Sequence, residues 1–485
     1  MLLESRVAQP TTEAQAARLV SELYGLEAAA RTLPGEYDDN FHLTSADGRE
    51  FVLKVMHPAR ELSFIDLQCR ALTHLAQRAP QLPLPRVIAN LRGELFTSIA
   101  AVEGAKRLVW LLSFVKGTVL AEVRPQAPEL LGDFGRFLGE MDAALQSFAH
   151  PAAHRELKWD SSRAGWIKEY VQHIGDAHRR ALVEKFLALY GAEVVPVLPR
   201  LRRSVIYGDA NDYNVLVSEP WPQPRKIVGV IDFGDLHYGL TVSELAIAAA
   251  YGILGKEDPL PAAAAIAAGY HRAFPLDEAE LSALFALIGA RLAVSVTNSA
   301  HRKTIMPDDP YVTVSETAAW EALERLEKIH ARFAHYTFRA ACGLSAFPQS
   351  EKIEKWLEAN AGLAASILDA DVKTAPSLVF DLSVGSTFLG AKPGVVNNPD
   401  VRERFSAEMK QAGAAFGVGR YDEPRLVYTS PLFGESINPT DERRTVHLGM
   451  DLFVERSVVQ RRGIIRCHAN HAIQRRAQSR SCLDE

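Results

Sequence analysis

The feature that most constrains this chain is a loop of acidic and amide side chains that runs directly into an apolar strand, residues 207–217 (YGDANDYNVLV). A second apolar strand follows and ends at Asp232, in the segment IVGVIDFG. Two strands joined by a short turn bring Asn214 and Asp232 to the same end of the pair. Because hard divalent cations take oxygen ligands, the sequence predicts a metal site here, with Asp209 beside it.

This set of side chains is the kind that phosphoryl transfer requires. That reaction needs a residue to orient the attacking hydroxyl, oxygen ligands for Mg²⁺ and a cation on the phosphates. Asp209 and Asn214 stand in a D-x-x-x-x-N pattern, and Asp232 stands in D-F-G. Lys54 offers the cation from an earlier strand. Each feature alone is most often a turn, a cap or a surface residue, but their order along the chain favours a kinase.

The N-terminal part of the chain predicts a small, mostly β unit. A capping-box pair, Thr12 and Gln15, opens an amphipathic helix. Two strand-like runs flank an Asp47-Gly48 turn, which predicts a hairpin with Lys54 on its second strand. The two-residue period of a strand places Lys54 on the same face as Val52 and Met56. A helical segment, SFIDLQCRALTHLAQ, and a buried strand, RLVWLLSFVKG, complete the unit.

Composition narrows the class of protein. The chain has 485 residues, of which 47% are hydrophobic and 23% charged, which is typical of a soluble protein with several domains. A net charge of −5 does not indicate a nucleic-acid binder. Four scattered cysteines without a CxxC pair favour reduced thiols and a cytoplasmic location. We expect no signal peptide, and we expect the longest apolar stretches, such as ELAIAAAYGIL, to be too short to span a membrane.

The pattern along the chain predicts four segments. Residues 1–117 form a mostly β lobe and residues 118–344 a mostly helical lobe, which together make a bilobal α/β (α+β) fold. Residues 345–440 form a connecting α/β region whose clearest strand is PSLVFDLSVGS. Residues 441–485 end in an arginine-rich tail, which is either a solvated basic segment or a segment read out of frame.

The segments GDANDYNVLV and GVIDFGDLHYG resemble those of the aminoglycoside phosphotransferase (APH) family, which has a protein-kinase-like fold. Within that family, these segments and VSVTNSAHRK are most similar to those of hydroxylysine kinases. The resemblance implies transfer of the terminal phosphoryl group of ATP or GTP to the hydroxyl of a small amino-bearing metabolite. The first candidate substrate is 5-hydroxylysine, and an aminoglycoside or another amino alcohol is the alternative. A nucleotide-binding module without turnover is an alternative of another class.

The resemblance also implies roles for individual residues. Asp209 orients and deprotonates the substrate hydroxyl, and Asn214 and Asp232 hold Mg²⁺. One residue departs from the family pattern, since Tyr207 stands where a histidine usually precedes the Gly-Asp pair. Tyrosine still donates a hydrogen bond but is larger, so the geometry of the loop is the property that this departure puts in question.

The same resemblance places the nucleotide between the lobes. Lys54 contacts the α- and β-phosphates, with Asp66 of the following helix as its expected acidic partner and Glu61 as the second candidate. The segment around Gly35 lies over the nucleotide, although it has one glycine where protein kinases have three.

The hinge and the substrate side complete the predicted site. Phe114 and Val115 belong to the hinge, where the purine binds backbone groups. Asp235 and Glu244 either bind an amine of the substrate or cap the helix TVSELAIAAAYG beside Ser243, and Asp235 is the one expected to face the cleft.

A second resemblance lies in the last segment. His447 and Asp451 stand in HLGMD, which resembles the first zinc-ligand segment of lysostaphin-like (M23) metallopeptidases. The later H-x-H of that family is missing, because the tail has only His468 and His471, so we expect no working peptidase. The chain is interpreted as a piece of a larger fusion with a peptidase-like domain and a class III aminotransferase. An ordinary strand histidine is the alternative for His447.

Overall fold

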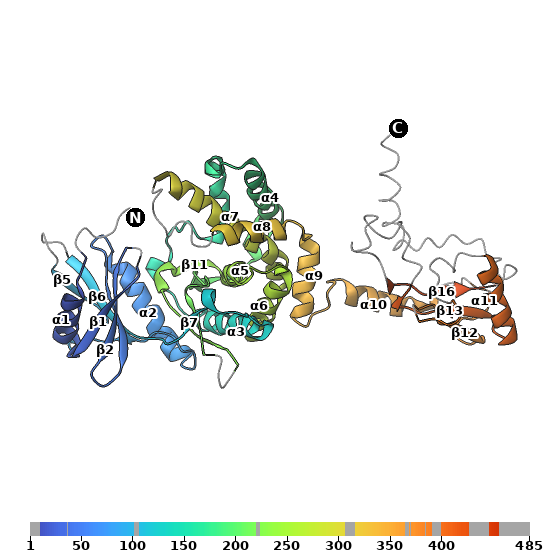
Figure 1. Cartoon of the computed structure of the whole chain (residues 1–485), viewed down its shortest axis with the longest axis horizontal. Coiled ribbons are helices and arrows are strands. Elements are labelled where there is room, and N and C mark those ends of the chain that lie inside the picture. The colour runs from blue at the N-terminus through green and yellow to red at the C-terminus, as the bar shows by residue number, and fades with distance from the viewer. Residues whose placement is uncertain are drawn as a thin grey trace. The chain divides into compact units, whose positions relative to one another are not determined.

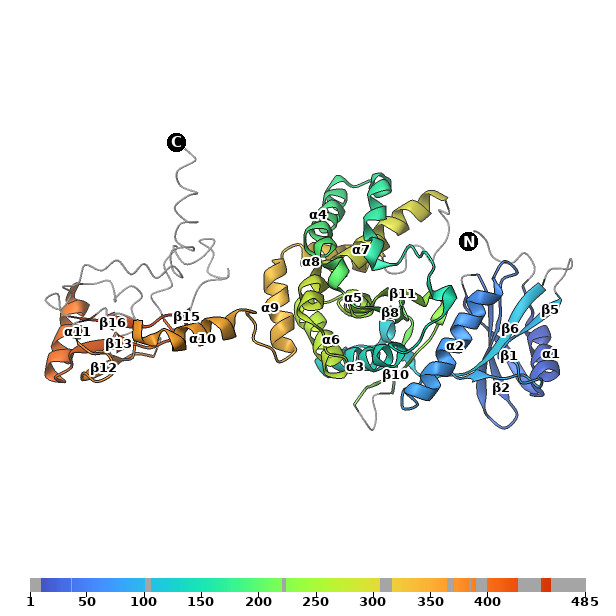
Figure 2. The same ribbon diagram turned by 180° about the vertical axis from the view of Figure 1, so that it is seen from behind.

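The structure is a computed structural model that describes residues 10–35, 37–100, 106–219, 224–305, 316–363, 368, 370–383, 385–389, 399–425 and 446–454. The chain divides into two compact units, Met1–Lys352 and Ile353–Glu485 (Figures 1 and 2). Both units combine helices with strands. The basic tail lies outside the described residues.

The first lobe of the first unit is built on a six-stranded sheet. Its strands are β1 (Ala28–Leu33), β2 (Asp39–Ser45), β3 (Glu50–Val55), β4 (Val87–Ile88), β5 (Thr97–Ala100) and β6 (Lys106–Ser113), and its helices are α1 (Glu13–Tyr24) and α2 (Leu62–Arg78). The strand order is β1-β2-β3-β6-β4, with β5 also on β6, and all pairings are antiparallel. The capping box at Thr12 and the hairpin at Asp47-Gly48 form as predicted.

Alternation along β3 decides which helix each side chain faces. Leu53 and Val55 lie in the buried cluster that includes residues of α1. Val52 and Met56 pack with the cluster on the other face, which includes residues of α2. Because side chains alternate between the two faces of a strand, Lys54 projects on the α2 side, as the sequence predicted.

The second lobe is mostly helical. Its helices are α3 (Pro128–Leu145), α4 (Ala177–Glu193), α5 (Thr241–Gly252), α6 (Pro259–Ala273), α7 (Glu278–Ile305), α8 (Glu316–Leu326) and α9 (Ala331–Ala341). Its strands are β7 (Thr118–Val119), β8 (Arg203–Ile206), β9 (Val215–Val217), β10 (Ile227–Val230) and β11 (His237–Leu240). They form two small sheets, β10-β9-β7 and β11-β8. The polar loop predicted from sequence therefore joins the two sheets, between β8 and β9.

Helix α7 corrects one sequence expectation. It has 28 residues and a stretch of mean hydropathy 1.7, so that among the described helices it is long and apolar enough to cross a membrane by length and composition. The same stretch is 89% buried inside the fold, and the helix packs against α4, α5, α8 and α9. The expectation that all apolar stretches are too short was wrong, because Ser282, Arg291 and Ser295 interrupt this stretch without making it polar overall.

The second unit holds a smaller sheet. Its elements are α10 (Ser350–Ala359), β12 (Ser377–Phe380), α11 (Pro399–Gln411), β13 (Phe416–Gly419), β14 (Glu423–Pro424), β15 (Val446–His447) and β16 (Asp451–Phe453), with α10 starting just before the unit boundary. Strand β13 pairs with β12 in parallel and with β16 antiparallel. The rings of Phe405 and Phe453 stack with centroids 4.4 Å apart in its core. Residues on both sides of position 440 therefore share one sheet.

Candidate active site

The loop between β8 and β9 starts from a glycine that is held in one conformation. Gly208 has a φ of +82°, and a Cβ there would meet the carbonyl oxygen of Asp235 at 2.8 Å, so the position requires glycine. Its N–H donates to Oε2 of Glu244 at 2.8 Å. The first turn of α5 thus fixes the backbone immediately before Asp209.

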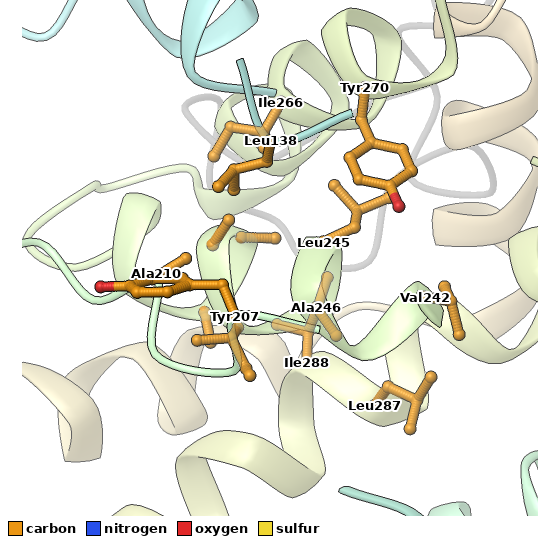
Figure 3. Packing of buried hydrophobic residues seen from close by; sticks show 14 of the residues in the cluster. Leu138, Tyr207, Ala210, Val242, Leu245, Ala246, Ile266, Tyr270, Leu287 and Ile288 are labelled. Atoms are coloured by element: carbon orange, nitrogen blue, oxygen red, sulfur yellow. The ribbon is translucent and has the colours of Figure 1, made fainter. Parts of the chain in front are cut away.

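Tyr207 ties this loop to the one that follows β10. Its side chain is fully buried, and its hydroxyl donates to the carbonyl oxygen of Ile231 at 2.5 Å. Its ring meets that of Phe233 with centroids 5.0 Å apart. Figure 3 shows Tyr207 and Ala210 within the same buried cluster. The tyrosine therefore fits the core and bridges the two loops that carry the predicted catalytic groups.

Asp209 and Asn214 meet across the loop, as the spacing predicted. Nδ2 of Asn214 donates to Oδ2 of Asp209 at 2.7 Å and to its carbonyl oxygen at 3.2 Å. Because the amide nitrogen is used in this way, the amide oxygen of Asn214 is the atom left for a cation. On the other side, Nη2 of Arg291 lies 3.5 Å from Oδ1 of Asp209.

Asp232 and Lys54 also meet, across the two lobes. Nζ of Lys54 lies 3.6 Å from Oδ1 of Asp232, and the pKa of Asp232 is lowered, with Lys54 as the main cause. Asp232 has a φ of +60°, and its carboxylate accepts the N–H of Gly234 at 3.2 Å. More than half of its side chain, 56%, is exposed, so the carboxylate is accessible to a cation in the cleft.

A cavity of about 740 Å³ lies beside these contacts, and Asn214 is not among the residues that line it. Lys54, Asp209, Asp232 and Asp235 line it, and so does Gly35. A Cβ at Gly35 would come within 2.5 Å of the Asn40 side chain, so this turn of the first lobe also requires glycine.

The predicted acidic partner of Lys54 is wrong. Asp66 contacts Nε of Arg70 at 3.3 Å and Nε2 of His150 at 3.1 Å. Glu61, the second candidate, lies at the exposed start of α2 and accepts a hydrogen bond from Ser63. In the described structure, the acidic group that Lys54 meets is Asp232.

Helical phase explains the error. Phe64 and Gln68, one turn apart on α2, line the cavity, and Asp66 lies between them in sequence and hence on the opposite side of the helix. Gln68 is buried, and its Nε2 donates to the Phe64 carbonyl oxygen at 3.2 Å. Sequence reasoning missed Gln68 because it looked for an acidic residue rather than for the phase of the helix.

The two predicted substrate residues lie in different surroundings. Asp235 lines the cavity, where burial raises its pKa and Arg155 opposes that rise. Glu244 is fully buried, is absent from the cavity lining and holds Gly208, so its predicted contact with substrate is wrong. The helix-cap alternative is also wrong for Glu244, because it bonds the loop before Asp209 rather than the start of α5.

The predicted hinge residues lie outside the cavity lining. The N–H of Phe114 donates to the Glu50 carbonyl oxygen at 3.1 Å, so that N–H is not available to a purine. The ring of Phe114 packs against His42 with centroids 4.4 Å apart. Val115 lies close to Gly229 of β10, and its part in purine binding stays a prediction.

Arg291 is a second residue that sequence reasoning missed. Its side chain is 2% exposed, and its guanidinium carbon lies 4.6 Å from the Trp159 ring centre and 5.6 Å from that of Tyr251. An arginine inside an otherwise apolar helix was the available signal, because a buried cation needs a partner. That partner is Asp209.

Arg291 should control the pH dependence of the reaction. Burial raises the pKa of Asp209 well above its ordinary value, Asp235 adds to the rise and Arg291 opposes it. A base must be deprotonated, so kcat/KM should fall as the pH drops through this pKa. Arg291→Met removes the opposing charge and should move that acid limb to higher pH. Arg291→Lys keeps a positive charge, so the acid limb of its kcat/KM profile should lie between those of the unmodified enzyme and Arg291→Met. An acid limb at the same pH in both variants as in the unmodified enzyme would show that Arg291 does not affect the pKa of Asp209.

Glu244 should make stability depend on pH. Burial raises its pKa to about 7 from an ordinary value of 4.5, so the folded chain holds a proton that the unfolded chain releases between those values. Stability should therefore fall as the pH rises through this window, by about 3 kcal/mol from this group. Glu244→Gln keeps an acceptor for the Gly208 N–H but cannot titrate, so the loss of stability with rising pH should be smaller in this variant.

Urea unfolding at pH 5 and pH 8 tests that expectation. Asp142 is also fully buried with a raised pKa, so part of the slope should remain in the Gln variant. An unchanged difference between the two pH values would show that Glu244 does not titrate in this range.

Sequence comparison identifies the family. Residues 29–284 match the phosphotransferase enzyme family (APH). A hydroxylysine kinase of Danio rerio is 31% identical over 326 residues, covering 65% of this chain and 91% of that protein. A hydroxylysine kinase of Bos taurus is 29% identical over 338 residues, covering 65% and 89%. The chain belongs to the phosphotransferase enzyme family, and it is a small-molecule kinase that acts on a hydroxyl.

Solved structures confirm the predicted fold. An amicoumacin kinase, in complex with AMP-PNP, Ca²⁺ and Ami, aligns with a TM-score of 0.50 at 14% identity, covering 66% of this chain and 95% of that one. A microcompartment-associated aminopropanol kinase aligns with a TM-score of 0.50 at 17% identity, covering 69% and 100%. The first unit thus has the bilobal α+β fold of these kinases.

The predicted zinc residues of the second unit contact each other. Nε2 of His447 lies 3.4 Å from Oδ1 of Asp451, and Oδ2 of Asp451 accepts a hydrogen bond from Nη1 of Arg425 at 2.6 Å. Within the described part of the chain, no three His, Cys, Asp or Glu side chains are grouped to hold a metal. His468 and His471 lie outside the described residues, and the peptidase and fusion interpretation stays a prediction.

Proposed function

We propose that this chain transfers the terminal phosphoryl group of ATP or GTP to the hydroxyl of a small amino-bearing metabolite, with 5-hydroxylysine as the first candidate. The observation that carries the proposal is the convergence of Lys54, Asp209 and Asp232 on one cavity. The names of the two similar kinases support the choice of substrate, since both are hydroxylysine kinases.

In this proposal Asp209 binds the acceptor hydroxyl and takes its proton as the oxygen attacks the phosphorus. Asn214 holds one oxygen of the Asp209 carboxylate, and Arg291 approaches the other. These contacts orient the base before substrate arrives, so that little reorganisation is needed when the hydroxyl binds.

The cation site is proposed from the donor set. The free amide oxygen of Asn214 and the exposed carboxylate of Asp232 are hard oxygen ligands, which fit Mg²⁺. A bound Mg²⁺ supplies positive charge for the phosphates of the nucleotide. Lys54 then contacts the α- and β-phosphates, Gly35 lies over them, and Val115 faces the purine.

Enzyme assays test the proposal directly. Purified full-length chain should consume ATP or GTP in the presence of Mg²⁺ only when a hydroxyl amine is added, with 5-hydroxylysine preferred over aminopropanol and an aminoglycoside. Asp209→Asn is the control for contaminating kinases. Nucleotide loss that is independent of the acceptor, or equal in the variant, would overturn the proposal and favour a binding module without turnover.

A further inference from the structure

Acidic and cationic side chains both line the cavity. In the described part of the chain they are Asp38, Glu156, Asp209, Asp232, Asp235, Lys54, Arg60, Arg155, Lys158 and Arg302. Nη2 of Arg60 lies 3.3 Å from Oδ2 of Asp38, and Nζ of Lys54 lies 3.6 Å from Oδ1 of Asp232. Asp235 is close enough to Asp209 for its charge to add to the burial that raises the pKa of Asp209.

Helix α7 runs from Asp209 to another part of the cavity lining. Arg291 contacts Asp209, and Asn298 and Arg302 line the cavity further along the same helix. These three positions recur near the helical repeat and so share one face. With a rise of 1.5 Å per residue, Asn298 lies about 10 Å along the axis from Arg291. The helix therefore extends from the catalytic base to a second polar region.

Asn298 offers its side-chain amide to a ligand in that region. Its side chain is 7% exposed and lines the cavity. Its amide belongs to no hydrogen bond among the described residues. Because an amide carries both donors and an acceptor and this one lines the cavity, it is available to bind a ligand there.

Lys158 adds a positive charge to the same cavity lining. The side chain lines the cavity and is half-buried, and no ion pair within the described structure includes it. Its Nζ lies 5.7 Å from the centre of the Trp166 ring. Burial lowers the pKa of His301, three residues beyond Asn298 on α7, and the charge of Lys158 lowers it further. Of the two acidic residues nearest in sequence, Glu156 lies 2.6 Å from Nη1 of Arg163, and Asp160 accepts the N–H of Ser162 at 2.9 Å.

We propose that Lys158 and Asn298 form a subsite for the carboxylate of the acceptor, so that the substrate class is a hydroxylated amino acid. This inference rests on the proposed function. A zwitterion matches the cavity, because its hydroxyl and neighbouring amine meet Asp209 and Asp235 while its carboxylate meets Lys158 and the amide of Asn298. An aminoglycoside carries several amines and no carboxylate, and so would place a cation against Lys158.

A pair of acceptors that differ in one group tests the subsite. 5-Hydroxylysine and its decarboxylated analogue, 1,5-diaminopentan-2-ol, share the hydroxyl and the adjacent amine. The full-length enzyme should show a kcat/KM about 10- to 100-fold higher for the amino acid, the range expected for hydrogen bonds to a charged group. Lys158→Met and Asn298→Ala should remove this preference by lowering kcat/KM for 5-hydroxylysine alone.

The control variant is Lys168→Met, the same change at an exposed lysine outside the cavity lining, and it should leave both acceptors unaffected. Asn298→Asp should have a lower kcat/KM for 5-hydroxylysine than Asn298→Ala, because a negative charge repels a carboxylate. This order distinguishes loss of the subsite from loss of folding.

Equal use of both acceptors by the unmodified enzyme would overturn the subsite alone. A rise in the nucleotide KM of Lys158→Met, without loss of discrimination, would assign Lys158 to the triphosphate and overturn it too. No turnover of either acceptor would overturn the proposed function and this inference with it.

Discussion

Asp209→Asn should lower kcat by about 10³-fold, within the range that a general base contributes. The variant keeps the shape of the side chain and an oxygen that can accept the hydrogen bond from Asn214, so the loop should not move. It loses the ability to take the proton of the acceptor hydroxyl. Steady-state assays with saturating nucleotide and acceptor measure the change, and the KM values should vary little.

The matched control is Asp212→Asn in the same loop. Asp212 is absent from the cavity lining, and burial raises its pKa to about 6, so loss of its charge should cost the fold little. This variant should retain nearly full kcat. A comparable loss in both variants would mean that the loop as a whole, and not the carboxylate of Asp209, supports the reaction.

Asp232→Asn should lower kcat/KM by more than about 100-fold and raise the Mg²⁺ concentration needed for half-maximal rate, since even indirect ligands contribute 10- to 100-fold to metal affinity. The carboxylate is 56% exposed and pairs loosely with Lys54, so stability should change little. A Mg²⁺ titration at fixed nucleotide separates weaker metal binding from a slower chemical step.

Asp258→Asn is the control for that substitution. Asp258 caps α6 by accepting the N–H of Leu260, and asparagine caps a helix equally well. Both activity and Mg²⁺ dependence should be unchanged. An Asp232→Asn enzyme with the same Mg²⁺ dependence as this control would remove Asp232 from the proposed cation site.

The sequence predicted which of these polar side chains lie together, because their positions follow from local rules. Asp209 and Asn214 are close in the chain, so the loop geometry that joins them was readable from spacing, and the contact at 2.7 Å confirms it. The face of Lys54 followed from strand alternation, which β3 obeys. The approach of Asp232 to Lys54 needed the order of the motifs and the family resemblance as well.

The predictions that failed were those for side chains that contact residues distant in the sequence. Asp66 was chosen for its charge, but the phase of α2 turns it toward His150 and leaves Gln68 on the cavity side. Glu244 was expected either to bind an amine of the substrate or to cap the helix, but the burial of α5 turns it against Gly208. The phase of α2 could be read from its apolar spacing, whereas the burial of Glu244 depends on how α5 packs in the core.

The sequence by itself determined the reaction class, because phosphoryl transfer needs a base, hard oxygen ligands and a cation in a fixed order. Only the tertiary structure decided which side chains surround them. Arg291 lies far from Asp209 in the chain, and only the packing of α7 brings its guanidinium to the base. Asn298 and Lys158 likewise become neighbours of one cavity through folding alone, since a contact between remote segments depends on how the whole core packs.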